Sequence, residues 1–548
     1  MTSRRLVIAL LWVGCFLLLQ VRNVDDVDVF TQIRLGRLAL ATGGLPPTEP
    51  LCFPLAGQPF IPLGWLAQVL GALLWNLGGM PLLQTARGAA YATAVVAAAA
   101  IPLAGRPPGL PGLFVATCVC LLSLITSANL RPQAIALLGF VALYRLATGS
   151  YPRGFRVAAT IALGIVWQNC HPSLPAGVAL VGLLAVGTIA QRRPGPAPTA
   201  GPAPVGADPA AVAAPATPGE LLLLAGVLAV LQMATPLGTG IFALSRLNYT
   251  VSREWLGVSE WLPPWHPDVL PVLVPFWAAW AGTLVHALLH PGRVTRLQLV
   301  LGVPFSFLPL LSCRFVLFWA PVLAPVWAAW ADQAWPTQPR PTQAWPTQAA
   351  PPQAGPVTPV TFPPETTTVA TTPPEPALPI PGPASPAGEV PEPASRQRPQ
   401  GPLRAAALAG LLGGLALPWL LPPLPRSEVP LAAIGELARR LPAGRIYNYR
   451  EWGGPLALFG NEGWRLAIDG RLYLFPREEW ATYAAAAAGQ VTVASLTERY
   501  RPDAFFLRPE YHRLLIERLD RDPAWHRAWQ DALAVVYLPA ASTPATAP

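Results

Sequence analysis

Acids and bases stand together directly after the first apolar segment of the chain. Asp25, Asp26 and Asp28 lie where the chain would leave a bilayer. Arg34 and Arg37 follow within three helical turns. Carboxylates near hydrocarbon can act in proton transfer, and arginines there can bind lipid phosphates. Apolar residues after Asp28 recur at helical spacing, which indicates a helix in the membrane interface. The spacing alone favours a plainer alternative, a solvated turn followed by a surface helix.

Further candidates lie at the ends of later apolar segments. Arg131 and Arg314 each precede a span, where an arginine usually anchors its helix at the lipid headgroups. His171 lies in a turn, and a lone histidine there is more often a hydrogen-bonded structural group than a ligand. Glu260 precedes Trp261 in a loop with other tryptophans. Such tryptophans can stack on sugar rings but are more often interface anchors.

The composition indicates a polytopic membrane protein. Of the 548 residues, 53% are hydrophobic and only 12% are charged, about half the charged fraction of soluble domains. The net charge of +9 comes from arginines scattered between apolar segments, which argues against a nucleic-acid partner. The six cysteines contain no C-x-x-C pair, so neither a zinc site nor a disulfide framework is indicated.

Eleven apolar segments are predicted to span the membrane. The positive-inside rule places the loops around Arg106, Arg153, Arg192 and Arg293 on the side of the N-terminus, which is then cytoplasmic. This arrangement requires that the apolar segment 65–83 does not cross, and we expect a helix at the outer interface there. The predicted spans are residues 6–20, 83–104, 110–127, 131–147, 155–170, 172–190, 219–236, 267–289, 296–312, 315–331 and 404–422.

The chain divides into four predicted parts. Residues 1–331 form the membrane core, and residues 404–425 form the last span. Between them, residues 332–403 are rich in Pro, Thr and Ala and are expected to be a disordered linker on the inner side. An outer stalk is the alternative for this segment. Residues 426–548 are expected to form a soluble α/β domain outside the membrane with about four strands. Within it, Asp469 precedes a glycine at a strand end, a position typical of a turn.

The first outer loop resembles that of bacterial integral-membrane proteins of the C-type glycosyltransferase superfamily. Relatives include protein O-mannosyltransferases, aminoarabinose transferases and galacturonosyltransferase-like families. Residues 127–140, 167–180 and 258–268 resemble later outer elements, and the C-terminal part resembles one largely uncharacterised branch. The pattern of the first loop comprises an acid motif, a juxtamembrane helix ending in Gly, a Pro-rich turn and an aromatic-Trp-Leu motif. These match Asp26-Val-Asp28, Gly36, Pro46–Pro50, Phe60 and Trp65-Leu66.

The resemblance implies transfer of a sugar from a polyprenyl-phosphate donor to a glycan, lipid or protein acceptor outside the membrane. It implies no cofactor and no metal, and a multi-pass protein of the bacterial inner membrane. By family analogy Asp28, with Asp26 close by, is the base for the acceptor hydroxyl. Arg131, with Arg314 behind it, is the candidate for the donor phosphate. The remaining matched positions, expected to bind substrate, are His171, Glu260 and Glu49.

Departures from the family pattern keep other functions open. Gln32 replaces the usual His, Gly64 replaces the usual acid before Trp-Leu, and Glu49 replaces an Asp. A degenerate relative that binds lipid-linked sugar or a partner enzyme is therefore the alternative. A transporter is a third possibility, but the sequence shows neither repeated halves nor intramembrane charge pairs.

Overall fold

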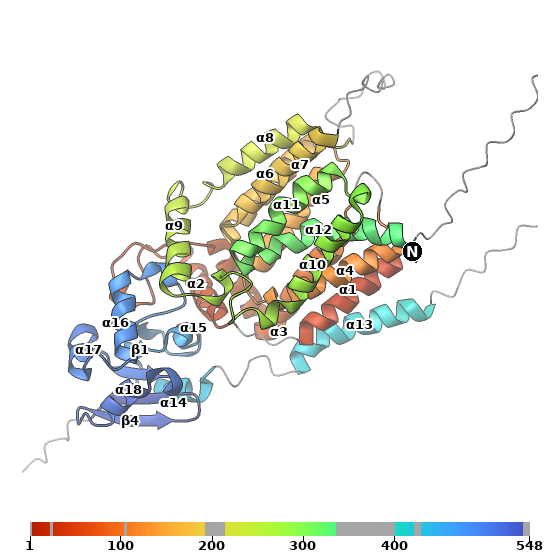
Figure 1. Ribbon diagram of the computed structural model, residues 1–548. Helices are drawn as coiled ribbons and strands as arrows, with labels where there is room; N and C mark the ends of the chain where they lie inside the picture. Colours follow the sequence, from red (N-terminus) through yellow and green to blue (C-terminus); the bar gives the residue numbers. More distant parts are fainter. Residues whose placement is uncertain are drawn as a thin grey trace, which may run out of the picture. The chain divides into compact units, whose positions relative to one another are not determined.

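The computed structural model describes residues 3–21, 26–102, 107–191, 214–335, 401–420 and 429–540 (Figure 1). The helical core and the C-terminal module belong to one compact unit. Residues 338–404 form a second unit, of which only the last few residues are described. The disorder predicted for the linker falls on residues outside the described ranges, and so does Asp25.

The described part of the core is helical. Each of the eleven predicted spans overlaps a helix, and α2 and α9 are additional. By length and composition, seven helices can cross a membrane, namely α1, α3, α4, α7, α10, α12 and α13, while α5, α8 and α11 are apolar but shorter. The protein is therefore a multi-pass membrane protein, and the number of eleven crossings stays a prediction. The helices are α1 (Ser3–Val21), α2 (Asp28–Thr42), α3 (Trp65–Ala99), α4 (Leu110–Leu124), α5 (Gln133–Thr148), α6 (Arg153–Cys170), α7 (Leu174–Gln191), α8 (Pro218–Leu231), α9 (Gly240–Tyr249), α10 (Val274–Leu289), α11 (Arg296–Leu311), α12 (Val316–Ala334) and α13 (Gly401–Leu420).

A kink divides α3 into two parts. Gly78 and Gly79 have non-helical backbone angles, and Gly79 has a φ of 61°, which favours glycine. Pro81 follows at once and lacks the N–H that a continuous helix would use. The sequence predicted a separate interfacial helix at 65–83, and the break lies a few residues before the end of that segment.

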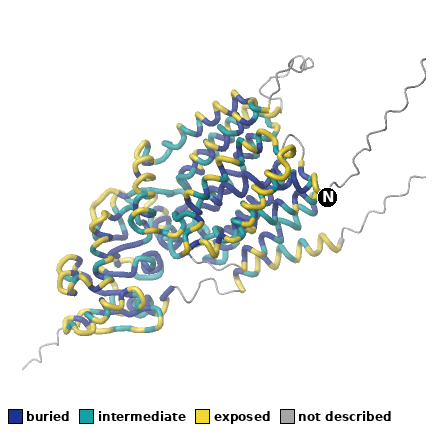
Figure 2. Tube along the Cα trace, in the orientation of Figure 1, coloured by how far each residue is buried: buried dark blue, intermediate teal, exposed yellow. Residues whose placement is uncertain are grey.

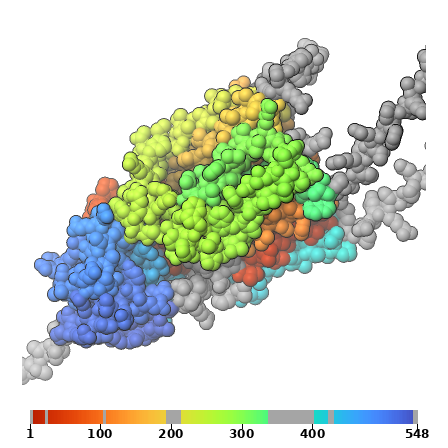
Figure 3. All heavy atoms as spheres, in the orientation of Figure 1, coloured from red at the N-terminus to blue at the C-terminus, as the bar shows by residue number. Residues whose placement is uncertain are grey.

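The core packs around α12. In the apolar stretch of this helix 83% of the residues are buried, against 11% in α10 and in α13. Figure 2 shows buried residues along the central helices and exposed ones along α13. α12 packs along α4 and α11. On the face shown in Figure 3, the side chains of α9, α10 and α11 form a continuous surface. Helices that are apolar on their exposed faces are suited to contact with lipid.

The C-terminal module is a five-stranded sheet with helices packed on it. The strand order is β2-β1-β3-β5-β4, in which β1 is parallel to β2 and β3, and β5 is antiparallel to β3 and β4. The predicted small α/β module is confirmed, with one more strand than expected. The unpredicted strand, β4, is an edge strand whose only fully buried residue is Trp525, so it lacks an apolar alternation. The elements are α14 (Leu431–Arg440), β1 (Ala443–Asn448), α15 (Gly453–Phe459), β2 (Gly463–Leu466), α16 (Arg477–Ala487), α17 (Val493–Tyr500), β3 (Ala504–Leu507), α18 (Pro509–Leu519), β4 (Trp525–Gln530) and β5 (Val535–Pro539).

The first loop of the core is joined to this sheet. The backbone N–H of Leu466 in β2 donates to the carbonyl of Leu51 at 2.9 Å. Cys52 forms a parallel bridge with Leu466, and α15 packs on α2. The C-terminal module therefore packs directly on the first loop. Cys52 is a buried free thiol, as are Cys170 and three of the four other cysteines.

Candidate functional site

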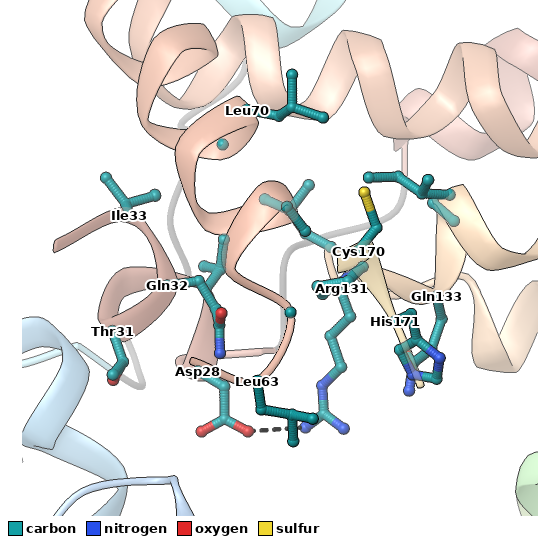
Figure 4. Close-up of a pocket in the computed structure, with 18 of the residues that line it drawn as sticks. Asp28, Thr31, Gln32, Ile33, Leu63, Leu70, Arg131, Gln133, Cys170 and His171 are labelled. Atoms are coloured by element: carbon teal, nitrogen blue, oxygen red, sulfur yellow. Dashed lines mark hydrogen bonds and ion pairs between the residues drawn. The ribbon is translucent and has the colours of Figure 1, made fainter. Parts of the chain in front are cut away.

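A cavity of about 290 Å³, here called the main cavity, lies between the first loop, the core helices and the C-terminal module. Its charged end is lined by Asp28 from α2, Arg131 before α5, His171 after α6 and Arg314 before α12. Figure 4 shows Asp28, Arg131 and His171 around this space. Four of the predicted site residues therefore meet in one place, although they lie far apart in the sequence.

Arg131 is held by three carboxylates. Its Nη2 lies 3.2 Å from Oδ2 of Asp28, and its Nη1 lies 2.6 Å from Oε2 of Glu260. Its Nε and Nη2 both donate to Asp26. All three guanidinium nitrogens thus donate to carboxylates, which fixes the orientation of Arg131 beside Asp28.

Glu260 links Arg131 to a second arginine. Its Oε1 accepts a hydrogen bond of 2.9 Å from Nη1 of Arg314. Nη2 of Arg314 lies 3.1 Å from Nε2 of His171, and its guanidinium carbon lies 4.7 Å from the ring centroid of Trp261. Among the described residues, Nε of Arg314 has no partner. Arg314 therefore keeps hydrogen-bonding capacity toward the cavity, whereas Arg131 has little.

His171 is a neutral acceptor in this arrangement. Its Nε2 faces a guanidinium, which can only donate, so we assign the ring proton to Nδ1, 2.8 Å from Oγ of Ser173. Burial, and then the positive charges of Arg314 and Arg131, lower the pKa of His171 to about 3. The ring therefore orients Arg314 and carries no charge at neutral pH.

Asp28 is the carboxylate that faces the cavity. Its side chain is 39% exposed, and its Oδ1 has no hydrogen-bond donor among the described residues. Enclosure by the surrounding protein, and then the negative charge of Asp26, raise the pKa of Asp28 to about 7 against the attraction of Arg131. For Glu260, burial is outweighed by Arg314 and Arg131, so its pKa is lowered. A carboxylate with a pKa near neutrality can accept a proton from a hydroxyl group.

Asp26 lies behind Arg131. Its side chain is 4% exposed and does not belong to the cavity lining. Its Oδ1 accepts a hydrogen bond of 3.0 Å from the backbone N–H of Asp28, a donor that the start of α2 leaves unpaired. Asp26 was predicted to be catalytic together with Asp28. In the structure Asp26 contacts the start of α2 and Arg131 and does not line the cavity, and a catalytic role for it stays a prediction.

The C-terminal module supplies part of the cavity wall. A Cβ on Gly470 would stand 1.9 Å from Oδ1 of Asp28, so only glycine fits there. Arg471 and Tyr473, which follow Gly470, line the cavity. The turn η9 (Leu472–Leu474) contacts α9 and the π-helical turn η3 (Thr250–Trp255). The sequence did not single out this loop as part of the site.

Glu49 belongs to a different cluster from the one predicted. Its Oε1 lies 2.6 Å from Nη2 of Arg471, which also lies 2.7 Å from Oδ2 of Asp469. The backbone N–H groups of Leu51 and Cys52 donate to Glu49 as well. Glu49 does not line the cavity. Its ion pair joins the first loop to the C-terminal module, and the substrate-binding role expected from the sequence stays a prediction.

Besides Thr31, four neutral polar side chains line the main cavity, namely Gln32, Gln133, Asn248 and Tyr473. The sequence analysis noted Gln32 only as a departure and missed the other three. A local signal existed for two of them. Gln32 lies four residues after Asp28, on the same face of a helix, and Gln133 lies two residues after Arg131. Asn248 and Tyr473 carry no such signal.

The other end of the main cavity is apolar. Arg87 lies in this part, where its Nη2 donates to the carbonyl of Leu19 at 2.6 Å, at the end of α1. The cavity thus combines a charged end with an apolar end. The apolar lining comes from α3 and α5 and includes Leu70, Leu74, Leu83, Ala86, Ala90 and Ile135.

Two glycines in the first outer loop, Gly36 and Gly64, are explained by the structure. Gly36 lies inside α2, not at its end as the pattern suggests, and α2 is closed by Gly43 with a φ of 68°. A Cβ on Gly36 would stand 2.0 Å from the carbonyl oxygen of Gln68, so α2 and α3 pack backbone against backbone. Gly64 has a φ of 69°, which disfavours the acid usual at that position.

A side cavity of about 170 Å³ shares Gln133 and Arg314 with the main cavity and is also lined by Glu260. Arg314 therefore separates the two spaces. Within the described part of the chain, no group of three or more His, Cys, Asp or Glu side chains is arranged to hold a metal ion.

The sequence matches no protein-family model and no curated protein. Solved structures do match the fold. Among them is the archaeal oligosaccharyltransferase AglB from Archaeoglobus fulgidus, in complex with an inhibitory peptide and a dolichol-phosphate. The TM-score is 0.51 at 10% sequence identity, over 93% of this chain and 70% of that chain. The chain shares the fold of this oligosaccharyltransferase. The fold expected from the first loop is thereby supported over nearly the whole chain.

Proposed function

We propose that this protein is a membrane glycosyltransferase that moves a sugar from a polyprenyl-phosphate donor to an acceptor hydroxyl group at the outer face of the bacterial inner membrane. The strongest support is that Asp28 and two arginines line one cavity whose other end is apolar. A prenyl phosphate needs a cationic group beside an apolar wall, and the acceptor needs a base next to both. The dolichol-phosphate in the AglB complex is a lipid of this kind.

Asp28 takes the proton of the acceptor hydroxyl in this mechanism. The hydroxyl oxygen then bonds to the anomeric carbon of the sugar while the bond from that carbon to the phosphate oxygen breaks. The phosphate leaves with the bonding electron pair, and the configuration of the anomeric carbon inverts. The proton on Asp28 is returned to solvent before the next cycle.

Arg314 is better placed than Arg131 to bind the departing phosphate. Its Nε is unpaired among the described residues, and it lines both cavities. The nitrogens of Arg131 already donate to three carboxylates. Arg131 therefore serves mainly to orient Asp28 and Glu260, which reverses the order of the two arginines expected from the sequence.

The test uses the full-length protein in lipid nanodiscs with radiolabelled mannosyl polyprenyl phosphate as donor. Fractions of bacterial envelope lipid, glycan and protein serve as acceptors. We expect the wild-type protein to move label to one fraction and Asp28→Asn to lose transfer while donor binding persists. A wild-type protein that binds the donor but leaves it intact with every fraction would show that the enzymatic proposal is wrong.

Binding without turnover is the second candidate function. It is favoured by Gln32, which lines the cavity where the families that the chain resembles carry His. An amide side chain cannot transfer a proton as imidazole does. A protein of this kind would hold lipid-linked sugar, or a partner enzyme, and its Asp28→Asn variant would behave as the wild-type protein does.

A further inference from the structure

The charged groups of the main cavity already have partners. Arg131 and Arg471 each donate to at least two carboxylates. Arg314 donates to one carboxylate, and its remaining capacity is used by the donor phosphate in the proposed function. Asp28 is the one carboxylate among the described lining residues, and it serves as the base. Once the donor is bound, the described residues at the charged end of the cavity leave neither a free cation nor a spare anion for a charged group on the sugar; Arg87 lies at the other end and donates to the carbonyl of Leu19.

The neutral side chains of the cavity have hydrogen-bonding capacity to spare. Gln32, Gln133 and the phenol of Tyr473 make no hydrogen bond to any described residue. Asn248 uses only its carbonyl oxygen, which accepts a bond of 3.3 Å from Ser252. These side chains come from α2, α5, α9 and η9, so they surround the space. Gln133 is only 7% exposed, so its amide gains from a hydrogen bond to a ligand in the cavity.

We propose that the main cavity takes a neutral, polyhydroxylated sugar and discriminates against sugars that carry an ammonium or a carboxylate group. The hydroxyl groups hydrogen-bond to Gln32, Gln133, Asn248 and Tyr473. This inference rests on the proposed function and specifies its substrate.

Amides and a phenol both donate and accept, as the hydroxyl groups of a sugar require. An ammonium group on the sugar would be repelled by the guanidinium groups of Arg131 and Arg314, and Asp28 is already paired with Arg131. A carboxylate on the sugar would face Asp28, with Asp26 and Glu260 behind it, and would find no free guanidinium. Removing a charged group from water without a partner is costly, so both kinds of sugar bind poorly here.

Tyr473 makes the C-terminal module part of this selection. It follows Arg471, whose buried ion pairs with Glu49 and Asp469 fix the loop. Gly470 holds the same loop against Asp28. A loop that is fixed in this way positions its side chains precisely enough to discriminate between ligands. Tyr473→Phe removes one hydroxyl group and leaves the ring that packs the loop.

The experiment measures binding to the full-length protein in nanodiscs by displacement of fluorescent polyprenyl phosphate. The probes are short-chain polyprenyl phosphates that carry mannose or glucose, 4-aminoarabinose, galacturonic acid or no sugar. We expect a neutral sugar to lower Kd at least tenfold relative to either charged sugar. Tyr473→Phe and Gln133→Met should each raise the Kd of the neutral donors about fivefold, which is about 1 kcal/mol. They should leave the Kd of bare polyprenyl phosphate unchanged.

Tyr511→Phe is the matched control, because Tyr511 lies in the same module and does not line the cavity. Melting temperatures confirm that each variant is folded. Equal or tighter binding of a charged sugar overturns the inference, and so does an unchanged preference in both cavity variants. A preference for neutral sugars without any turnover supports the inference and contradicts the enzymatic proposal. Failure to bind any prenyl phosphate, bare or glycosylated, contradicts both.

Discussion

The protein contains two clusters of arginine and carboxylate side chains that differ in how far they are shielded from solvent. We call the cluster of Arg471, Glu49 and Asp469 the closed cluster. Around Arg471, the side chains of Arg471, Glu49 and Asp469 are 5%, 3% and 0% exposed. Around Arg131, the side chains of Arg131 and Asp28 are 26% and 39% exposed. Both clusters join the first loop to another part of the protein. The second opens into the main cavity through Asp28 and Arg131, whereas the first reaches this cavity only through Arg471.

The two clusters also differ in whether their carboxylate oxygens all have hydrogen-bond donors. Glu49 and Asp469 accept from backbone N–H groups as well as from Arg471, so their oxygens are satisfied. Asp28 accepts only from Arg131 among the described residues, and its pKa is raised to about 7. A satisfied carboxylate stabilises, whereas a carboxylate with free lone pairs and a near-neutral pKa can take a proton.

The largest effect should come from removing the proton acceptor. Asp28→Asn should lower the rate of sugar transfer by about 10²–10⁴-fold, the usual contribution of general acid–base catalysis. Asp469→Asn, the same change in the closed cluster, should alter the rate per folded molecule less than threefold, because Asp469 does not line the cavity. Single-turnover transfer, normalised to folded protein, measures both. Similar losses in the two variants would remove the functional distinction between the clusters.

The closed cluster should matter more for stability. Arg471→Met leaves two carboxylates buried without a cation, which costs about 3–5 kcal/mol. Arg131→Met should cost less, because Asp28 and Glu260 can be solvated from the cavities. The melting temperature and the protease sensitivity of the C-terminal module provide the measurement. Glu49→Gln combined with Arg471→Met should recover part of the loss. A lower melting temperature for Arg131→Met than for Arg471→Met would contradict this ranking.

The sequence was sufficient for the parts of the site that follow from local pattern. Apolar segments locate the helices, whereas Asp28 was singled out by the resemblance of its acid motif to a family pattern, because spacing alone favoured a solvated turn. Arg131 and Arg314 were found because arginines at the starts of apolar helices are conspicuous. The role of Asp26 was not predictable, because its burial behind Arg131 depends on a residue 105 positions away.

The contribution of the C-terminal module was not predictable for the same reason. Glu49 and Arg471 are 422 positions apart, and no periodicity links them. In the sequence, Gly470 is an ordinary turn glycine, and only the structure shows that it packs against Asp28. Tyr473 lies in a short turn that packs against α9 and η3, so residues adjacent in sequence do not determine its position. Long-range packing, which local propensity does not encode, decides these positions.

The pH dependence should separate the two clusters further. Because Asp28 must be ionised to accept a proton, kcat/KM should rise about tenfold per pH unit below its pKa of about 7 and level off above it. For an aspartate with the usual pKa, this rising limb of the pH profile would lie near pH 4. His171 stays neutral throughout, since its pKa is about 3, so His171→Gln should keep the limb where it is. A limb near pH 4 in the wild-type protein would contradict the burial argument for Asp28.

The smallest effect should be a shift of that limb in Glu260→Gln. The negative charge of Glu260 is one of the causes that raise the pKa of Asp28. Removing this charge while Arg131 stays in place lowers the pKa, so the limb should move to lower pH by less than about one unit, or 1.4 kcal/mol. Arg314 loses one of its anchors at the same time, so donor binding should weaken modestly. Glu49→Gln is the comparison from the closed cluster and should leave the limb in place, because Glu49 is not among the groups that act on Asp28. The measurement is the pH profile of kcat/KM for the three proteins under one buffer system. If Glu260→Gln moved the limb to higher pH, or Glu49→Gln moved it as far, the charge of Glu260 would not be a cause of the raised pKa of Asp28.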